Sequence, residues 1–193
     1  MTNLGYFVIL NRRHFYGPER MTTMMDIQLL SDFGWSISVE RIRKDIFFLA
    51  SSLPCRTANY TMPGRGVNTL SEADDVIAHK LVSFGYYAVE YEPHLAQAFR
   101  CNPDKPIHKQ HDTPLPTDPW YRIHNIIGKK RGKSKPQEII VFLAHKDSQS
   151  WLAHKGPFSP GAYDNATGTA ACLEIARLLG KMECERSVWF MFT

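Results

Sequence analysis

Two apolar runs that flank one amphipathic segment set the strongest limit on the fold. Residues 139–143 read Ile-Ile-Val-Phe-Leu, and residues 187–193 read Ser-Val-Trp-Phe-Met-Phe-Thr. Continuous rather than alternating apolar runs are typical of strands that are covered on both faces. Between them, residues 166–179 carry small and aliphatic side chains at helical spacing, and Gly180 follows as a C-terminal cap. Strand, crossover helix and strand predict a right-handed parallel unit.

Upstream of these runs, helices and strands alternate along the chain. Apolar residues spaced three and four apart from Val39 to Leu53 predict a helix that ends before Pro54. A second helix is expected from Thr69 to Gly85, with the Thr69 hydroxyl and the Glu72 carboxylate forming a capping box. Further strands are expected at residues 86–91, 120–127 and 138–144.

The segment between the last two of these strands is strongly basic. It predicts an antiparallel hairpin whose tip carries Lys129, Lys130, Arg131, Lys133 and Lys135. A solvated tip that keeps a sheet edge soluble is favoured over a phosphate site. The whole pattern predicts an α/β fold with a mixed, mainly parallel sheet sandwiched by helices, in one domain. Residues 1–37 show no clean period and are expected to form an N-terminal arm of unclear structure.

Charge, cysteine content and hydropathy exclude several classes of protein. The formal charge of +4 depends on the five basic residues of the tip, since without them 18 basic residues face 19 acidic ones, which argues against nucleic acid as a partner. The four cysteines show no paired ligand spacing and are expected to be free, buried thiols. No apolar stretch is long enough for a membrane span, and no signal peptide is evident, so a cytoplasmic location is expected.

Two polar clusters follow the strand at 139–143 and precede the helix at 166–179. His145 comes directly after the strand, with Asp147 two positions on. Ligands bind beyond the carboxyl ends of strands in open α/β sheets, so this position favours a functional role for His145. Asp164 lies at the junction of a loop and the second helix, where it is either the helix N-cap or a metal ligand. A loop histidine, His154, is a weaker candidate ligand.

Taken together, the clusters resemble the zinc-dependent aminopeptidase family that includes the bacterial leucyl aminopeptidases. The resemblance rests on Ile139–Ser148, on Gly161–Leu179 and on Arg186–Phe192, and it extends over residues 38–193. It implies that His145 binds one zinc ion, that Asp147 orients this histidine, and that Asp164 bridges two zinc ions. The family hydrolyses peptides or small amino-acyl substrates at a free amino terminus, through a water that the two metals activate.

The sequence departs from the family at two positions and covers only part of its pattern. Tyr163 stands where the family usually has an acidic residue, and Lys146 stands where an aromatic or aliphatic residue is common. The family's general-base glutamate and its remaining ligands follow the strand that ends at Phe192. We therefore expect residues 38–193 to be the N-terminal part of the domain, truncated after a central strand. A non-catalytic interaction module and a single-zinc glutaminyl cyclase-like enzyme are the alternatives, and metal stoichiometry separates the three.

Overall fold

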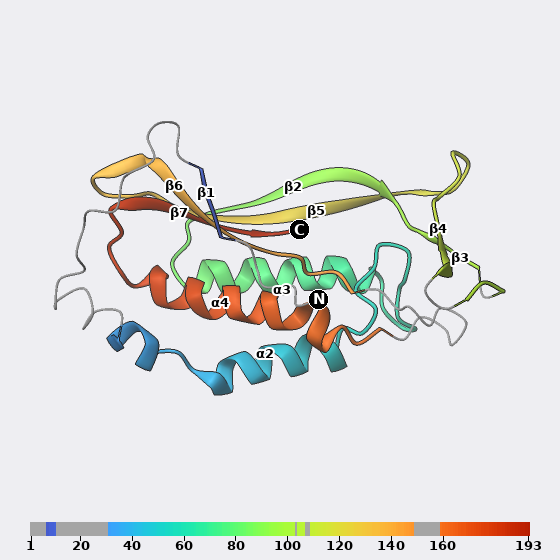
Figure 1. The fold of residues 1–193 in the computed structure, drawn as a ribbon, viewed down its shortest axis with the longest axis horizontal. Coiled ribbons are helices and arrows are strands. Elements are labelled where there is room, and N and C mark those ends of the chain that lie inside the picture. Colours follow the sequence, from blue (N-terminus) through green and yellow to red (C-terminus); the bar gives the residue numbers. More distant parts are fainter. Residues whose placement is uncertain (1–6, 11–30, 103, 107–108, 149–158) are drawn as a thin grey trace.

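The computed structural model describes residues 7–10, 31–102, 104–106, 109–148 and 159–193. Five strands form one sheet in the order β1-β6-β7-β5-β2, and the helices lie on one side of it (Figure 1). The sheet consists of β1 (Phe7–Leu10), β2 (Ala88–Gln97), β5 (Trp120–Lys130), β6 (Lys135–Ala144) and β7 (Arg186–Phe192). The other elements are α2 (Val39–Ser51), α3 (Thr69–Ser83), α4 (Thr167–Gly180), a π-helical turn at Ala162–Ala166, and a small sheet of β3 (Arg100–Cys101) and β4 (His111–Asp112).

The predicted mixed α/β fold is confirmed, but the described sheet is mainly antiparallel. Only β6 and β7 pair in parallel, through the α4 crossover, whereas β1–β6, β5–β7 and β2–β5 are antiparallel. β2 and β5 can pair antiparallel because the described part of their connection, between residues 98 and 119, contains the short strands β3 and β4 and no crossover helix. In the described residues, α3 and α4 cover the same face of the sheet and α2 packs beneath α4, so helices on both faces are not observed (Figure 1).

The predicted hairpin between β5 and β6 is wrong, because β7 lies between these two strands. β7 pairs antiparallel with β5 and parallel with β6, and its side chains are buried or half-buried along its whole length. An apolar strand gains most from the centre of a sheet, where both of its edges are also hydrogen-bonded. The short connection from β5 to β6 therefore crosses over the start of β7, where the Gly132 amide donates to the Ser187 hydroxyl at 3.0 Å.

The crossing requires a glycine at position 132. A β-carbon there would collide with the backbone of Arg186 and Glu185, and backbone cannot move aside as a flexible side chain can. We expect Gly132→Ala to lower the free energy of unfolding by about 1–3 kcal/mol, as overpacking does elsewhere. Urea denaturation measures this change. Gly66→Ala is the matched control, because nothing lies within 4 Å of its β-carbon position; an equal effect of the two variants would contradict the packing argument.

The structure contains the two predicted helices α2 and α3, but their ends differ from the predicted ones. The α2 helix begins after Ser38, whose hydroxyl accepts from the Arg41 amide at 3.3 Å. The cap of α3 is Asn68 rather than Thr69, since the Asn68 side chain accepts from the Ser71 amide at 2.8 Å. Thr69 is buried instead, and its hydroxyl donates to the Cys55 carbonyl. The predicted capping box is therefore wrong, and the Glu72 carboxylate pairs with Arg65 instead.

The core lies between the sheet and the pair α3 and α4. Phe190 is fully buried at its centre, stacked on Phe142 at 4.8 Å between ring centroids and edge-on to Tyr86 at 5.6 Å. A second apolar cluster joins the end of α2 to α3 and to the turn before α4, and consists of Leu49, Leu53, Ala73 and Ala166. Cys55 and Cys172 are free and buried, as predicted. Among the described helices, none has the length and apolar character needed to cross a bilayer.

Strand β1 belongs to the region that was expected to be an arm. Residues Phe7–Leu10 pair antiparallel with Ile139–Phe142 at the edge of the sheet. A short helix at residues 31–35 precedes α2. Residues 1–6 and 11–30 of the expected arm lie outside the described residues.

Candidate metal centre

The end of β6 positions His145. The backbone segments that follow β6 and β7 stay paired beyond Ala144, the last paired residue of β6. The Lys146 amide donates to the Thr193 carbonyl at 2.8 Å, and the Thr193 amide donates to the Ala144 carbonyl at 3.1 Å. The His145 carbonyl in turn accepts from the Thr169 hydroxyl at 3.1 Å, which ties the residue to the first turn of α4. His145 is thus held from both sides at the carboxyl end of the parallel strand pair.

The turn before α4 positions Asp164. Its start, Gly161, has a φ of +54°, a conformation that favours glycine. Asn165 performs the capping that Asp164 could have performed, since its side-chain oxygen accepts from the Gly168 amide at 3.0 Å while its side-chain nitrogen lies 3.3 Å from the His145 carbonyl. The N-cap alternative for Asp164 is therefore not what the structure shows, and the Asp164 carboxylate is left for another partner.

The three residues singled out from the sequence meet in one place. The Nδ1 atom of His145 lies 2.8 Å from Asp147 Oδ1, and its Nε2 atom lies 3.0 Å from Asp164 Oδ1. All three side chains are between 40% and 61% exposed, so the cluster is open to solvent and to a ligand. The hydrogen bond to Asp147 raises the pKa of His145, against the opposing effect of burial, and the charges of Asp147 and Asp164 add to the increase.

This donor set suits a metal such as zinc. An imidazole nitrogen and a carboxylate oxygen converge on one point, and the other ring nitrogen already has the carboxylate partner that fixes a metal-binding tautomer. Within the described ranges, however, no group of three or more His, Cys, Asp or Glu side chains could hold a metal ion together. His145 and Asp164 are therefore two candidate ligands, whereas a catalytic zinc usually has three from protein. His154 lies outside the described residues.

Sequence reasoning missed a buried arginine beside this cluster. Arg56 is completely buried, and its guanidinium donates to backbone carbonyls of three separate segments. Burial lowers its pKa to about 10, although the Asp147 charge acts in the opposite direction, so the side chain remains charged at neutral pH. No local pattern marks this residue, because an arginine that follows a helix end is ordinarily solvated.

Sequence reasoning also missed the role of Lys146, which it noted only as a departure from the family. Lys146 is buried, and its ammonium donates to the His124 carbonyl at 2.6 Å and lies 3.4 Å from Asp74 Oδ1. Asp74 is buried as well, and its other oxygen lies 3.4 Å from His124 Nδ1. Burial lowers the pKa of Lys146 and raises that of Asp74, and the attraction between the two charges opposes both shifts.

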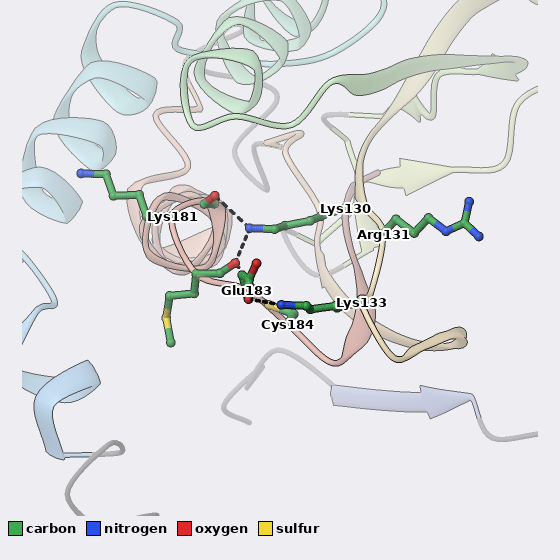
Figure 2. Close-up of a pocket in the computed structure, with 8 residues that line it drawn as sticks. Lys130, Arg131, Lys133, Lys181, Glu183 and Cys184 are labelled. Carbon is green, nitrogen blue, oxygen red and sulfur yellow. Dashed lines mark hydrogen bonds and ion pairs between the residues drawn. The ribbon is translucent and has the colours of Figure 1, made fainter.

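The basic segment between β5 and β6 is engaged within the fold. Figure 2 shows the Lys130 ammonium directed at the end of α4, where it donates to the carbonyls of Leu179, Gly180 and Met182 at 2.5–2.8 Å. Lys133 pairs with Glu183 at 2.8 Å. Lys130, Lys133 and Glu183 are among the residues that line a pocket of about 390 Å³. Lys130 acts as a cation at a helix C-terminus, where the helix dipole favours positive charge.

Comparison with known proteins supports the resemblance. Residues 125–193 match the model of Peptidase family M28. Aminopeptidase YwaD of Bacillus subtilis is 41% identical over 68 residues, which are 35% of this chain and 13% of that protein. A protein of Leptosphaeria maculans named as a probable zinc metalloprotease is 38% identical over 61 residues, 31% of this chain and 14% of its own length. The resemblance to the zinc aminopeptidases is thus confirmed for the segment that carries His145 and Asp164.

Solved structures with the same fold extend the comparison to most of the chain. The aminopeptidase from Aneurinibacillus sp. strain AM-1 has a TM-score of 0.59 and 14% identity, covering 83% of this chain and 63% of that one. The glutaminyl cyclase from Tannerella forsythia has a TM-score of 0.58 and 18% identity, covering 81% of this chain and 46% of that one. At such identities the likeness shows the fold alone. The matched segments cover only 13–14% of the curated relatives named above and 46–63% of these two structures.

Proposed function

We propose that this chain forms the N-terminal part of a zinc-dependent aminopeptidase that hydrolyses the first peptide bond of its substrates. The observation that carries the proposal is the geometry at His145, whose Nδ1 atom is held by Asp147 at 2.8 Å while its Nε2 atom faces Asp164 at 3.0 Å. The similarity to an aminopeptidase and to a zinc metalloprotease over this same segment supports the choice of metal and reaction.

In this proposal each of the three residues has one task. His145 binds a zinc ion through Nε2, and Asp147 accepts the Nδ1 proton, which fixes the tautomer and makes the imidazole a better donor. Asp164 would hold zinc beside His145, and its negative charge would offset part of the positive charge of the bound metal. Zinc, when bound, would polarise the scissile carbonyl and acidify a water molecule for the attack. Residues 38–193 would then belong to the metal-binding domain, with the remaining ligands supplied by further residues of the complete protein.

Metal content and substrate preference of the complete protein test this function together. We expect two zinc ions per molecule, and hydrolysis of an aminoacyl p-nitroanilide that disappears when the amino group of the substrate is acetylated. Removal of zinc by a chelator should abolish the activity, and added zinc should restore it. One zinc ion and cyclisation of an N-terminal glutamine would favour a glutaminyl cyclase-like enzyme instead. No bound zinc and no hydrolysis would favour a non-catalytic interaction module.

A further inference from the structure

Arg56 joins three segments that are distant in sequence. Its guanidinium donates to the carbonyl of Leu49 at 2.6 Å, to that of Lys146 at 2.7 Å, and to that of Gly161 at 3.1 Å. Further bonds at 3.1–3.2 Å reach the carbonyls of Pro160 and Leu53. A guanidinium has five N–H donors in a rigid planar fork, so it fixes the relative positions of the acceptors around it.

Two of these three segments carry the candidate metal ligands. Lys146 lies between His145 and Asp147, and Gly161 lies three residues before Asp164. The Lys146 and Gly161 carbonyls are bonded to the same guanidinium, through Nε and Nη2 respectively. Arg56 therefore links the loop that presents His145 to the turn that presents Asp164, and the end of α2 supplies the third anchor.

Ser148 forms further hydrogen bonds between Arg56 and the two loops. The Arg56 amide donates to the Ser148 hydroxyl at 3.0 Å, and the Ser148 amide donates back to the Arg56 carbonyl at 3.0 Å. The Ser148 hydroxyl then donates to the Ser159 carbonyl at 2.8 Å. A β-carbon at position 161 would lie 2.8 Å from the Arg56 Nη2 atom, so the arginine and the turn are packed without spare room.

We propose that Arg56 is a positioning residue that sets the separation between His145 and Asp164 and thereby the affinity of the site for zinc, an inference that rests on the proposed function. A buried charge is costly, and apolar side chains of similar volume often stabilise a core equally well. The guanidinium is nevertheless satisfied by backbone carbonyls alone, with no carboxylate within the set of acceptors. The hydrogen bonds of the guanidinium hold together the two loops that carry His145 and Asp164.

Zinc binding by the complete protein provides the first test. Arg56→Met removes all the donors and keeps an unbranched apolar chain, and Arg56→Lys keeps the charge without the planar fork. We expect calorimetric titration with Zn²⁺ alone to show about 10- to 100-fold weaker binding for Arg56→Met, the range found when residues that orient a metal ligand are lost. Arg56→Lys should fall between Arg56→Met and the wild type. The matched control is Arg65→Met, whose partly exposed side chain pairs with Glu72 and touches neither ligand loop; its affinity should be unchanged.

Hydrogen exchange without metal provides a second, independent test. In the zinc-free protein, Arg56→Met should raise the exchange rates of the Lys146, Ser148 and Ala166 amides together, because these amides lie in the two linked loops. They are hydrogen-bonded to the carbonyls of Thr193, Arg56 and Gly161 respectively. Faster exchange confined to the end of α2, or zinc affinity equal to that of the wild type, would overturn the proposal. So would failure of both Arg56 variants to give the native near-ultraviolet circular dichroism, since Arg56 would then serve the core alone. A wild-type protein that bound no zinc would refute the proposed function, while the exchange data would still decide whether Arg56 links the loops.

Discussion

Replacing His145 with alanine is expected to abolish peptide hydrolysis and to remove zinc from the site. His145 supplies the only nitrogen ligand among the described candidates, and Nε2 points at Asp164 across 3.0 Å. Loss of a residue that merely orients a ligand costs up to about 100-fold, so loss of the ligand itself should exceed that. The side chain is 40% exposed, and its removal takes little from the core. Zinc content by atomic absorption and turnover of an aminoacyl p-nitroanilide measure the effect, with unchanged circular dichroism showing that the fold is retained.

Variants of Asp164 and Asp147 show how much each of these side chains contributes to zinc binding compared with His145. Asp164→Asn should behave like His145→Ala, because an amide cannot bridge two cations as a carboxylate does. Asp147→Asn should retain the metal more weakly, with a loss of about 10- to 100-fold. His94→Ala is the control, since His94 is exposed on β2 and lies outside the cluster. Wild-type turnover of the His145 variant in added zinc would show that the assignment of the site is wrong.

Replacing Lys146 with methionine is expected to cause a large loss of stability. Lys146 and Asp74 are each 2% exposed, and methionine would leave the Asp74 carboxylate buried opposite an apolar chain. Breaking a buried ion pair from one side typically costs about 3–5 kcal/mol, because the remaining charge loses its partner. The His124 carbonyl would lose its donor at the same time. Urea denaturation should therefore show a much lower midpoint, with a slope close to that of the wild type.

A second substitution, at Asp74, tests whether Lys146→Met loses stability because it leaves the Asp74 carboxylate buried without its ion-pair partner. In Lys146→Met with Asp74→Leu, the buried carboxylate is gone, and most of the lost free energy of unfolding should return. Lys133→Met is the matched control, since its ion pair with Glu183 is more than 70% exposed on both sides and should contribute less than about 1 kcal/mol. A double variant no more stable than Lys146→Met would mean that Lys146 acts through its carbonyl contacts rather than through Asp74.

The periodicity of apolar residues predicts where helices and strands lie along the chain. It does not predict which strands are neighbours in the sheet. A strand at 139–143 and a helix before Gly180 appear where they were predicted, but residues 139–143 are half-buried or exposed rather than covered on both faces. The insertion of β7 between β5 and β6 is decided by pairing between distant segments. The local sequence around residues 128–137 looks like a hairpin whether or not another strand lies between its arms. The cap of α3 moved to Asn68 because Thr69 gained a buried bond to Cys55, which is also a tertiary contact.

Some residues of the candidate site could be predicted from the sequence, and others could not. His145, Asp147 and Asp164 were found because they stand at the end of a strand and the start of a helix, where polar residues are chemically informative. Arg56 and Lys146 were not, since a cation that is buried by acceptors from several segments has the same sequence signature as a solvated one. Asn165 decided between the two roles open to Asp164, and that choice depended on which of two adjacent side chains reached the Gly168 amide.

The central place of β7 also governs the order in which this protein can assemble on the ribosome. β5 and β6 leave the exit tunnel before α4 and β7, and each then has one edge that only β7 can pair. Until that strand emerges, the unpaired backbone N–H and C=O groups along these two edges are open to other nascent chains. The Lys and Arg residues between them hold a positive charge at this exposed connection during the delay, which should discourage pairing between copies. The position of β7 therefore makes the period before it emerges the time at which these two edges can pair with another chain.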